Sequence, residues 1–165
     1  MFGFSTYTSF HFIKSNGMRV NLERVNDAVH FEGTSRSTTV KVHIDGTPEI
    51  GGQGLGSRPM ELVLMALGSC SALDLLLILK KQKQDVKSFS VSVDGTRREA
   101  LPPIFTKIHI VFHLSGDIDL LKAERAAELA VKKYCSVHDM LAAGGVEITY
   151  VVVASPHAST EEREF

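Results

Sequence analysis

Cys70 and Cys135 are the residues of this 165-residue chain whose types best suit redox chemistry. In such a pair, one thiolate attacks an oxidant and the second thiol then closes a disulfide. The alternative is that both are inert, because a free cysteine is often a small buried hydrophobe. Two cysteines are too few for the disulfide framework of a secreted domain or for an all-cysteine zinc site. The two therefore act as a pair or have no redox role.

Ionisable residues lie near both cysteines if each cysteine is on a helix. At 100° per residue, Asp74 is about 40° around the helix from Cys70, and His138 and Asp139 are about 60° and 40° from Cys135 if the helix continues there. A carboxylate raises a thiol pKa, whereas a protonated imidazole lowers it. Asp74 either holds the helix register through a hydrogen bond or relays protons beside Cys70. A metal site made of both cysteines, Asp74 and His138 fits no zinc spacing, so we expect no metal and no cofactor.

The element that holds Cys70 is an apolar run over residues 62–79. The run is too long for a strand, and Pro59 suits the first position of a helix. Its single charge over 18 residues makes a membrane span an alternative. Small polar residues and Asp74 interrupt the run, which favours a buried core helix. Because it is apolar on nearly every side, we expect this helix to be covered all round.

Alternating apolar and polar residues predict strands elsewhere in the chain. The expected strands are residues 18–23, 28–32, 38–44, 86–93, 104–114 and 146–154. A second helix is predicted over residues 120–134, and the pattern allows it to continue over 135–143 and to end at Gly144-Gly145. Three strands, a helix, two strands, a helix and a strand indicate an α+β fold rather than repeated βαβ units.

Composition narrows the classes of function. The chain has 18 Lys plus Arg against 19 Asp plus Glu and no basic block, which argues against a nucleic-acid partner. Residues 1–17 have neither the basic start nor the continuous apolar core of a secretory signal, so we expect a cytoplasmic protein that does not bind membranes. We expect an N-terminal extension over residues 1–17, one domain over 18–155 and a flexible C-terminal tail over 156–165.

The segments around both cysteines are distinctive. Residues 57–74 read SRPMELVLMALGSCSALD, and residues 133–137 read KYCSV. With the 65-residue separation of the cysteines and the strand order, these segments resemble the OsmC/Ohr family of peroxide-related proteins over roughly residues 18–154. The YhfA-like subgroup is similar in Cys-Ser-Ala-X-Asp and in the segments QDV (84–86), RRE (97–99) and FT (105–106).

The resemblance implies an OsmC-like fold in an intertwined homodimer. Strands of both chains wrap around long central helices, and the sites lie at the dimer interface. It also implies that Cys70 is the peroxidatic thiolate, which attacks an organic hydroperoxide. Cys135 then resolves the sulfenic acid as a disulfide, and a dithiol reductant restores both thiols.

The chain departs from the family's hydroperoxide reductases near Cys70. Those proteins place a glutamate directly after the helix-opening proline and an arginine in the first hairpin, whereas here Met60 follows Pro59. Glu61 comes next, about 180° around the helix from Cys70, and Arg24 lies near the hairpin turn. The candidate supporting residues are Asp74, Arg24, Glu61 and His138. Two functions remain open: a cysteine-based, antioxidant peroxidase of the oxidative stress response, and a non-enzymatic stress or small apolar ligand-binding protein on the same scaffold.

Overall fold

The computed structural model describes residues 17–156 of the chain. It divides into two compact units between Pro59 and Met60, and each unit is described by itself. The extension expected at residues 1–17 and the tail expected at 156–165 fall outside the described residues, apart from Gly17 and Pro156. The two units contain two sheets and three α-helices, which confirms the predicted α+β class.

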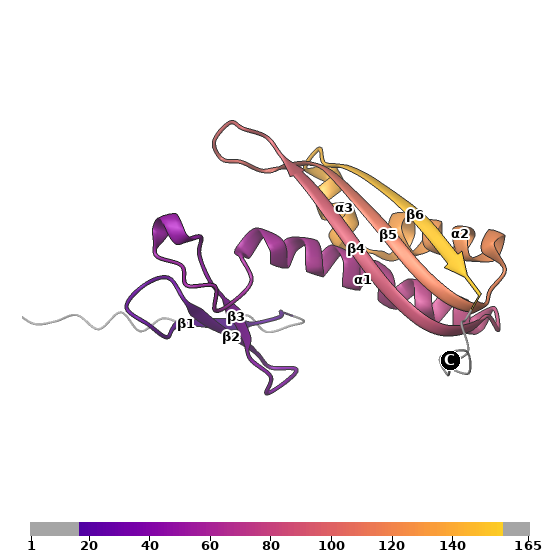
Figure 1. Ribbon diagram of the computed structural model, residues 1–165, viewed down its shortest axis with the longest axis horizontal. Helices are drawn as coiled ribbons and strands as arrows, with labels where there is room; N and C mark the ends of the chain where they lie inside the picture. The colour runs from indigo at the N-terminus through magenta and orange to yellow at the C-terminus, as the bar shows by residue number, and fades with distance from the viewer. Residues whose placement is uncertain (1–16, 157–165) are drawn as a thin grey trace, which may run out of the picture. The chain divides into compact units, whose positions relative to one another are not determined.

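The N-terminal unit is a three-stranded antiparallel sheet in the order β1-β2-β3 (Figure 1). Its strands are β1 (Val20–Arg24), β2 (Phe31–Ser35) and β3 (Val42–Ile44). The turn between β1 and β2 forms because Asn26 Oδ1 accepts hydrogen bonds from the backbone N–H groups of residues 28 and 30. The first two strands were predicted with shifted ends, and β3 is shorter than the predicted 38–44.

A buried carboxylate organises the loop that follows β3. Asp45 is 2% exposed and accepts hydrogen bonds from the backbone N–H groups of Gly46, Gln53 and Leu55, at 2.8, 2.8 and 3.0 Å. A short 3₁₀ helix, η1 (Pro48–Ile50), lies within this loop. The Asp45 side chain thus replaces the backbone partners that a regular strand or helix would supply.

Two histidines extend this polar interior. His30 is buried, and its Nε2 lies 3.0 Å from Nδ1 of His43 across the sheet. Besides His30 and Asp45, the described part of the N-terminal unit buries one further residue, Gly33 on β2. None of the buried hydrophobic residues in the described chain belongs to this unit.

The C-terminal unit contains the second sheet, in the order β4-β5-β6. The strands are β4 (Asp85–Arg97), β5 (Phe105–Asp117) and β6 (Glu147–Ser155); β4 pairs with β5 antiparallel, and β5 with β6 parallel. The β4–β5 hairpin is longer than the predicted 86–93 and 104–114. Its ends carry polar residues on the exposed face, so the hydrophobic alternation stops before the pairing does.

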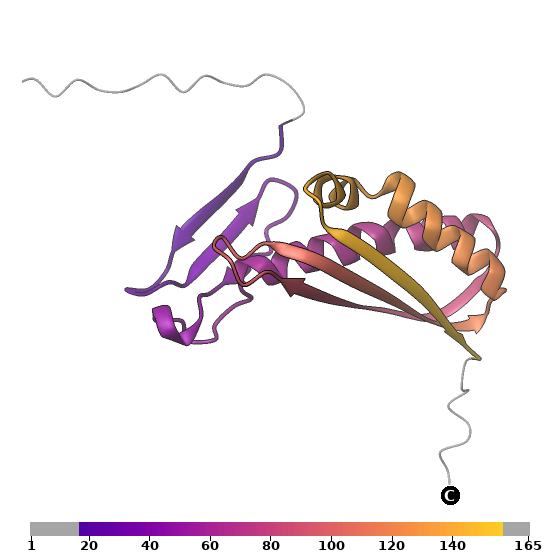
Figure 2. The ribbon, with the colours of Figure 1, turned by 90° about the horizontal axis from the view of Figure 1, so that it is seen from above.

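Three helices lie on one face of this sheet: α1 (Pro59–Lys81), α2 (Leu120–Leu129) and α3 (Ser136–Ala143) (Figure 1, Figure 2). Pro59 opens α1, as predicted, and α3 ends at Gly144. The core between helices and sheet is apolar, and its fully buried large side chains are Leu67, Leu75, Leu79, Val131, Ile108, Ile110 and Phe112. The helix that carries Cys70 is therefore fixed along one side by this core.

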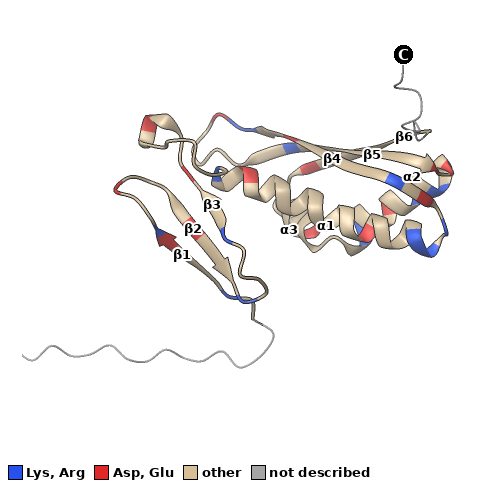
Figure 3. Ribbon diagram, turned by 60° about the horizontal axis from the view of Figure 1, so that its bottom comes forward, with Lys and Arg blue, Asp and Glu red and all other residues tan. Residues whose placement is uncertain are grey.

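The other side of α1 keeps exposed hydrophobic residues. Met65, Leu73 and Leu77 are 54, 65 and 57% exposed, and Figure 3 shows the helix almost without charge along its middle. By length and composition α1 would also suit a membrane span, a test that the core helix of a soluble protein passes equally. We expected other residues to pack around the whole of this helix. Within the described chain, they pack against one side of it only.

Candidate redox site

Cys70 lies on α1, near its middle, and is partly exposed. The next residue, Ser71, faces the core and is 0% exposed, as are Leu67 one turn before it and Leu75 one turn after it. The repeat of 3.6 residues per turn therefore places Cys70 at the edge of the buried face of the helix. At this edge a thiol is held by a rigid element and stays accessible.

Cys135 lies where the second helical segment breaks. After α2 the chain makes a π-helical turn, η2 (Ala130–Tyr134), closed by a hydrogen bond from Cys135 N–H to the Ala130 carbonyl at 3.0 Å. Cys135 itself is extended, with φ −74° and ψ 103°, and is the N-cap of α3. The helix considered above does not continue through this residue, so the angles that placed His138 and Asp139 beside it do not apply. Single π turns occur often at functional sites.

The sulfur of Cys135 lies among groups from both helices. The residue is 1% exposed, its Sγ accepts a hydrogen bond from His138 N–H at 3.3 Å, and the carbonyl oxygen of Leu67 lies 4.0 Å from the sulfur. The side chains of Ser71 and Cys70 on α1 also act on this thiol. Two cysteines that are 65 residues apart in the sequence are thus neighbours in the C-terminal unit.

These surroundings raise the pKa of the Cys135 thiol. Burial is the largest cause, and the neighbouring Cys70 thiol adds to it; the Ser71 hydroxyl and the N–H group of His138 act in the opposite direction. Ser71 Oγ forms no hydrogen bond of ordinary geometry with a described residue, yet it lies near enough to lower the pKa of the thiol. At neutral pH, Cys135 is therefore a protonated thiol with weak donors around it.

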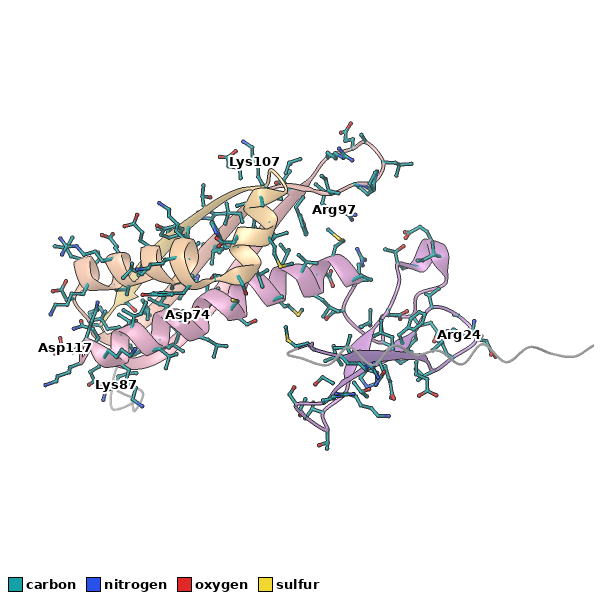
Figure 4. All side chains as sticks on the ribbon, turned by 180° about the vertical axis from the view of Figure 1, so that it is seen from behind. Arg24, Asp74, Lys87, Arg97, Lys107 and Asp117 are labelled. Carbon is teal, nitrogen blue, oxygen red and sulfur yellow. The ribbon has the colours of Figure 1, made fainter. Side chains whose placement is uncertain are left out.

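The candidate supporting residues on the helices play different parts. Asp74 lies on α1 (Figure 4) and is only partly buried, and none of the side-chain hydrogen bonds and ion pairs found among the described residues involves its carboxylate. Its carboxylate therefore keeps contact with water and needs no partner. His138 reaches Cys135 through its backbone N–H, while its imidazole Nδ1 lies 3.3 Å from the Asp139 carboxylate.

Glu61 lines a groove that does not include Cys70. The groove has a volume of about 570 Å³ and lies between α1 and β4; its lining residues are Glu61, Leu64, Met65, Gly68, Ser69, Phe89, Ser90, Val91 and Val93. Most of these side chains are apolar, and Glu61 adds a carboxylate. Arg24 is the last residue of β1 and belongs to the N-terminal unit (Figure 4), so the C-terminal unit does not bring it to Cys70.

The sequence analysis missed two features of this site. One is the buried hydroxyl of Ser71, for which direct adjacency to Cys70 was the available signal. The other is the π turn before Cys135, for which the helical pattern of residues 120–134 gave no sign. Among residues 17–156, no cluster of three or more His, Cys, Asp and Glu side chains is arranged to hold a metal ion.

The C-terminal unit is thus an α+β unit with two cysteines, one on a long apolar helix and the other at a helix start. The sequence model of the OsmC-like protein family matches residues 52–151. The chain therefore belongs to the OsmC family. Protein YhfA of Escherichia coli K12 is 44% identical over 99 residues, which cover 59% of this chain and 74% of that protein.

Solved structures share this fold. A hypothetical protein from Aquifex aeolicus is 31% identical with a TM-score of 0.70, covering 86% of this chain and 99% of that one. The organic hydroperoxide resistance protein OhrB of Bacillus subtilis is 18% identical with a TM-score of 0.58, covering 84% of this chain and 98% of that one. At that identity, the second likeness concerns the fold alone.

Proposed function

We propose that this protein is a thiol-dependent peroxidase that reduces organic hydroperoxides, with Cys70 as the peroxidatic residue and Cys135 as the resolving residue. The observation that carries the proposal is that the two cysteines are neighbours, one partly exposed on α1 and one buried at the start of α3. Membership of the family agrees with a redox role, and several of the proteins that share this fold are named for hydroperoxide resistance.

The reaction has three steps. The Cys70 thiolate attacks the terminal oxygen of the hydroperoxide; the O–O bond breaks, and the alkoxide takes up a proton and leaves as an alcohol. Cys70 becomes a sulfenic acid. The Cys135 sulfur then attacks the Cys70 sulfur, the sulfenic hydroxyl leaves as water with the Cys135 proton, and a disulfide forms. A dithiol reductant supplies two electrons and two protons to restore both thiols.

The environments of the two sulfurs support these roles. Cys70 is a partly exposed residue that an alkyl hydroperoxide can reach, whereas Cys135, a residue only 1% exposed, is shielded from it. The raised pKa of Cys135 keeps it protonated and protects it from direct oxidation until Cys70 has reacted.

A homodimer accompanies this proposal. Leu73 and Leu77 are exposed on α1, and one edge of the 13-residue strand β4 has no partner strand among residues 17–156; a second copy would cover both surfaces. Replacing both leucines by glutamate is expected to convert the protein from dimer to monomer in light scattering, while Lys107→Glu on the sheet leaves the mass unchanged. A wild-type chain that is monomeric at micromolar concentration contradicts the dimer. A cytoplasmic location fits the reducing partner that the cycle requires.

A second candidate function rests on the groove between α1 and β4. Its apolar walls and volume of about 570 Å³ suit a small apolar molecule. In this alternative the protein is a non-enzymatic stress or ligand-binding protein. Binding of an apolar fluorescent probe that is unchanged by Cys70→Ser, together with no hydroperoxide consumption, would favour it.

The deciding experiment counts thiols. The reduced protein is mixed with one equivalent of cumene hydroperoxide, and free thiols, cumyl alcohol and intact mass are measured. We expect stoichiometric alcohol, loss of both thiols and a mass lower by two hydrogens. Cys70→Ser is expected to abolish the reaction, and Cys135→Ser to allow one turnover that leaves Cys70 as a sulfenic acid, which excess hydroperoxide then overoxidises. Equal turnover by both variants, or two intact thiols in the wild type, contradicts the proposal.

A further inference from the structure

Ser71 is a buried polar residue for which the fold alone gives no reason. Its side chain is 0% exposed, and its Oγ makes no hydrogen bond of ordinary geometry within residues 17–156. Leaving a buried hydroxyl without a partner destabilises a protein, so native cores rarely contain one. An alanine or another small apolar residue would fill the position without this penalty.

The helix geometry directs this hydroxyl toward the Cys135 sulfur. A helical side chain points back toward the preceding turn, so the Ser71 side chain lies over the turn that contains Leu67. The Leu67 carbonyl oxygen is itself 4.0 Å from Cys135 Sγ. The Ser71 hydroxyl, which acts on the Cys135 thiol, and the Leu67 carbonyl therefore approach the sulfur from the same side of α1. Ser71 directly follows Cys70 in the sequence.

We propose that Ser71 is a positioning residue for disulfide closure, its O–H donating to Cys135 Sγ as that sulfur becomes negative and turns toward Cys70. This inference rests on the proposed function. In the resting protein the protonated Cys135 is a poor acceptor, and the Ser71 hydroxyl has no close hydrogen bond. As the thiol ionises, its sulfur becomes a strong acceptor, and the contact shortens. The atoms balance as before, because the Cys135 proton leaves in the water formed from the sulfenic hydroxyl.

The other described groups around the Cys135 sulfur do not supply a side-chain hydrogen-bond donor to it. His138 supplies a backbone N–H from the first turn of α3, and its imidazole lies beside Asp139. The titratable group that acts on Cys135 from α1 is Cys70, which raises the Cys135 pKa. The Leu67 carbonyl is an acceptor and favours the protonated thiol. From α1, the hydroxyl is thus the group that favours the ionised sulfur.

The test separates oxidation from closure. Wild type, Ser71→Ala and Ser71→Thr are mixed with one equivalent of cumene hydroperoxide over a series of pH values and quenched by acid. Mass spectrometry then follows the sulfenic acid and the disulfide. In Ser71→Ala we expect unchanged oxidation of Cys70, about tenfold slower closure, a closure profile shifted to higher pH and a longer-lived Cys70 sulfenic acid. Ser71→Thr keeps the hydroxyl and is expected to restore closure.

Two controls show whether slower disulfide closure arises from damage to the fold. Ser88→Ala removes an exposed hydroxyl that contacts Ser115 on the sheet and is expected to close at the wild-type rate. Ser71→Ala removes an unsatisfied buried group, so its melting temperature is expected to equal or exceed that of the wild type. Wild-type closure kinetics and pH profile in a folded Ser71→Ala protein overturn the inference.

A titration without peroxide distinguishes failure of this inference from failure of the proposed function. In Cys70→Ser protein, Cys135 is the sole cysteine, and its ionisation can be followed by the NMR shift of a labelled Cβ. Adding Ser71→Ala is expected to raise the Cys135 pKa further. If wild-type Cys70 does not react with hydroperoxide but this shift appears, the peroxidase proposal fails while the hydroxyl–sulfur contact stands. An unchanged pKa overturns the contact itself.

Discussion

The two units of the chain have opposite interiors. The C-terminal unit packs α1, α2 and α3 on one face of a sheet through leucine, isoleucine, alanine and phenylalanine side chains. The N-terminal unit buries His30, Gly33 and Asp45, and its hydrophobic residues Val20 and Leu22 are 66 and 60% exposed. Burial of apolar surface thus stabilises one unit, and hydrogen bonds to a carboxylate organise the other.

Because of this difference, only the C-terminal unit can hold the side chains of a redox site in a fixed geometry. A close-packed core holds side chains in single positions, whereas a small sheet without such a core opens locally at low cost. Cys70 and Cys135 both lie on elements of the packed unit. Burying the exposed hydrophobic residues of the N-terminal sheet against a second surface would stabilise that unit.

Leu75→Ala is expected to produce the largest loss of stability. The side chain is 0% exposed in the core of the C-terminal unit, and its truncation leaves a cavity. We expect the free energy of unfolding to fall by about 3 kcal/mol in urea denaturation followed by circular dichroism. The matched variant Leu55→Ala, at a side chain 51% exposed in the N-terminal unit, is expected to change it by less than about 0.5 kcal/mol. Equal losses would contradict the contrast between the interiors.

Gly68→Ala tests how closely α1 packs on β4. A Cβ at this position would lie 2.8 Å from Cγ2 of Val93, too close for two carbon atoms. Overpacking costs about 2 kcal/mol and the higher helix propensity of alanine returns about 1, so we expect a net loss near 1 kcal/mol.

A double-mutant cycle identifies the cause of that loss. Val93→Ala removes the methyl group that clashes, so combining it with Gly68→Ala is expected to cost less than the sum of the two single changes. Additive losses would show that the Cβ of residue 68 meets something other than Val93.

Sequence patterns were sufficient for most elements of both units. The apolar run with its opening proline gave α1, and alternation located the strands of both sheets. Strand ends were less predictable, because the β4–β5 pairing continues into residues whose exposed positions are polar. The hydrogen bonds of Asp45 were not predictable either, since its backbone partners lie up to ten residues further along the chain.

The candidate site was partly accessible from sequence. The spacing of the cysteines and their local contexts indicated a pair, but the arrangement around Cys135 depends on a π turn that single-residue propensities do not encode. Asp74 was expected to need a partner, because the whole helix was assumed to be buried. Its partial exposure arises because the described part of the chain leaves one face of α1 uncovered.

Acid is expected to open the N-terminal unit before the C-terminal unit. Backbone N–H groups of Leu55 and Gln53, then Gly46, hold the pKa of Asp45 below its ordinary value of 3.8. A lowered carboxyl pKa adds stability that is present above the unfolded value and is lost as pH falls below 3.8 through the folded pKa. Hydrogen exchange should therefore show these amides losing protection first at low pH.

Asp45→Asn tests at neutral pH whether the Asp45 carboxylate holds this loop. The amide keeps one acceptor oxygen, so it cannot satisfy the three N–H groups that the carboxylate bonds. Because the Gln53 and Leu55 amides donate to the same oxygen and the Gly46 amide to the other, we expect faster exchange either of the first two or of Gly46. Little change is expected in the core of the C-terminal unit. Glu49→Gln, at an exposed carboxylate in the same loop, serves as the matched control. Unchanged exchange in Asp45→Asn would show that the loop is held by other contacts.

The smallest effect is expected from an exposed ion pair of the C-terminal unit. Lys107 Nζ lies 3.4 Å from the Glu147 carboxylate, with side chains 69 and 62% exposed on neighbouring parallel strands. Water and salt screen such a pair, so a double-mutant cycle to alanine in urea should give a coupling below about 0.5 kcal/mol that declines with added salt. A coupling above about 1 kcal/mol would mean that this face of the sheet is shielded from water. In that case a partner must cover the face, and apolar packing would no longer account by itself for the stability of this unit.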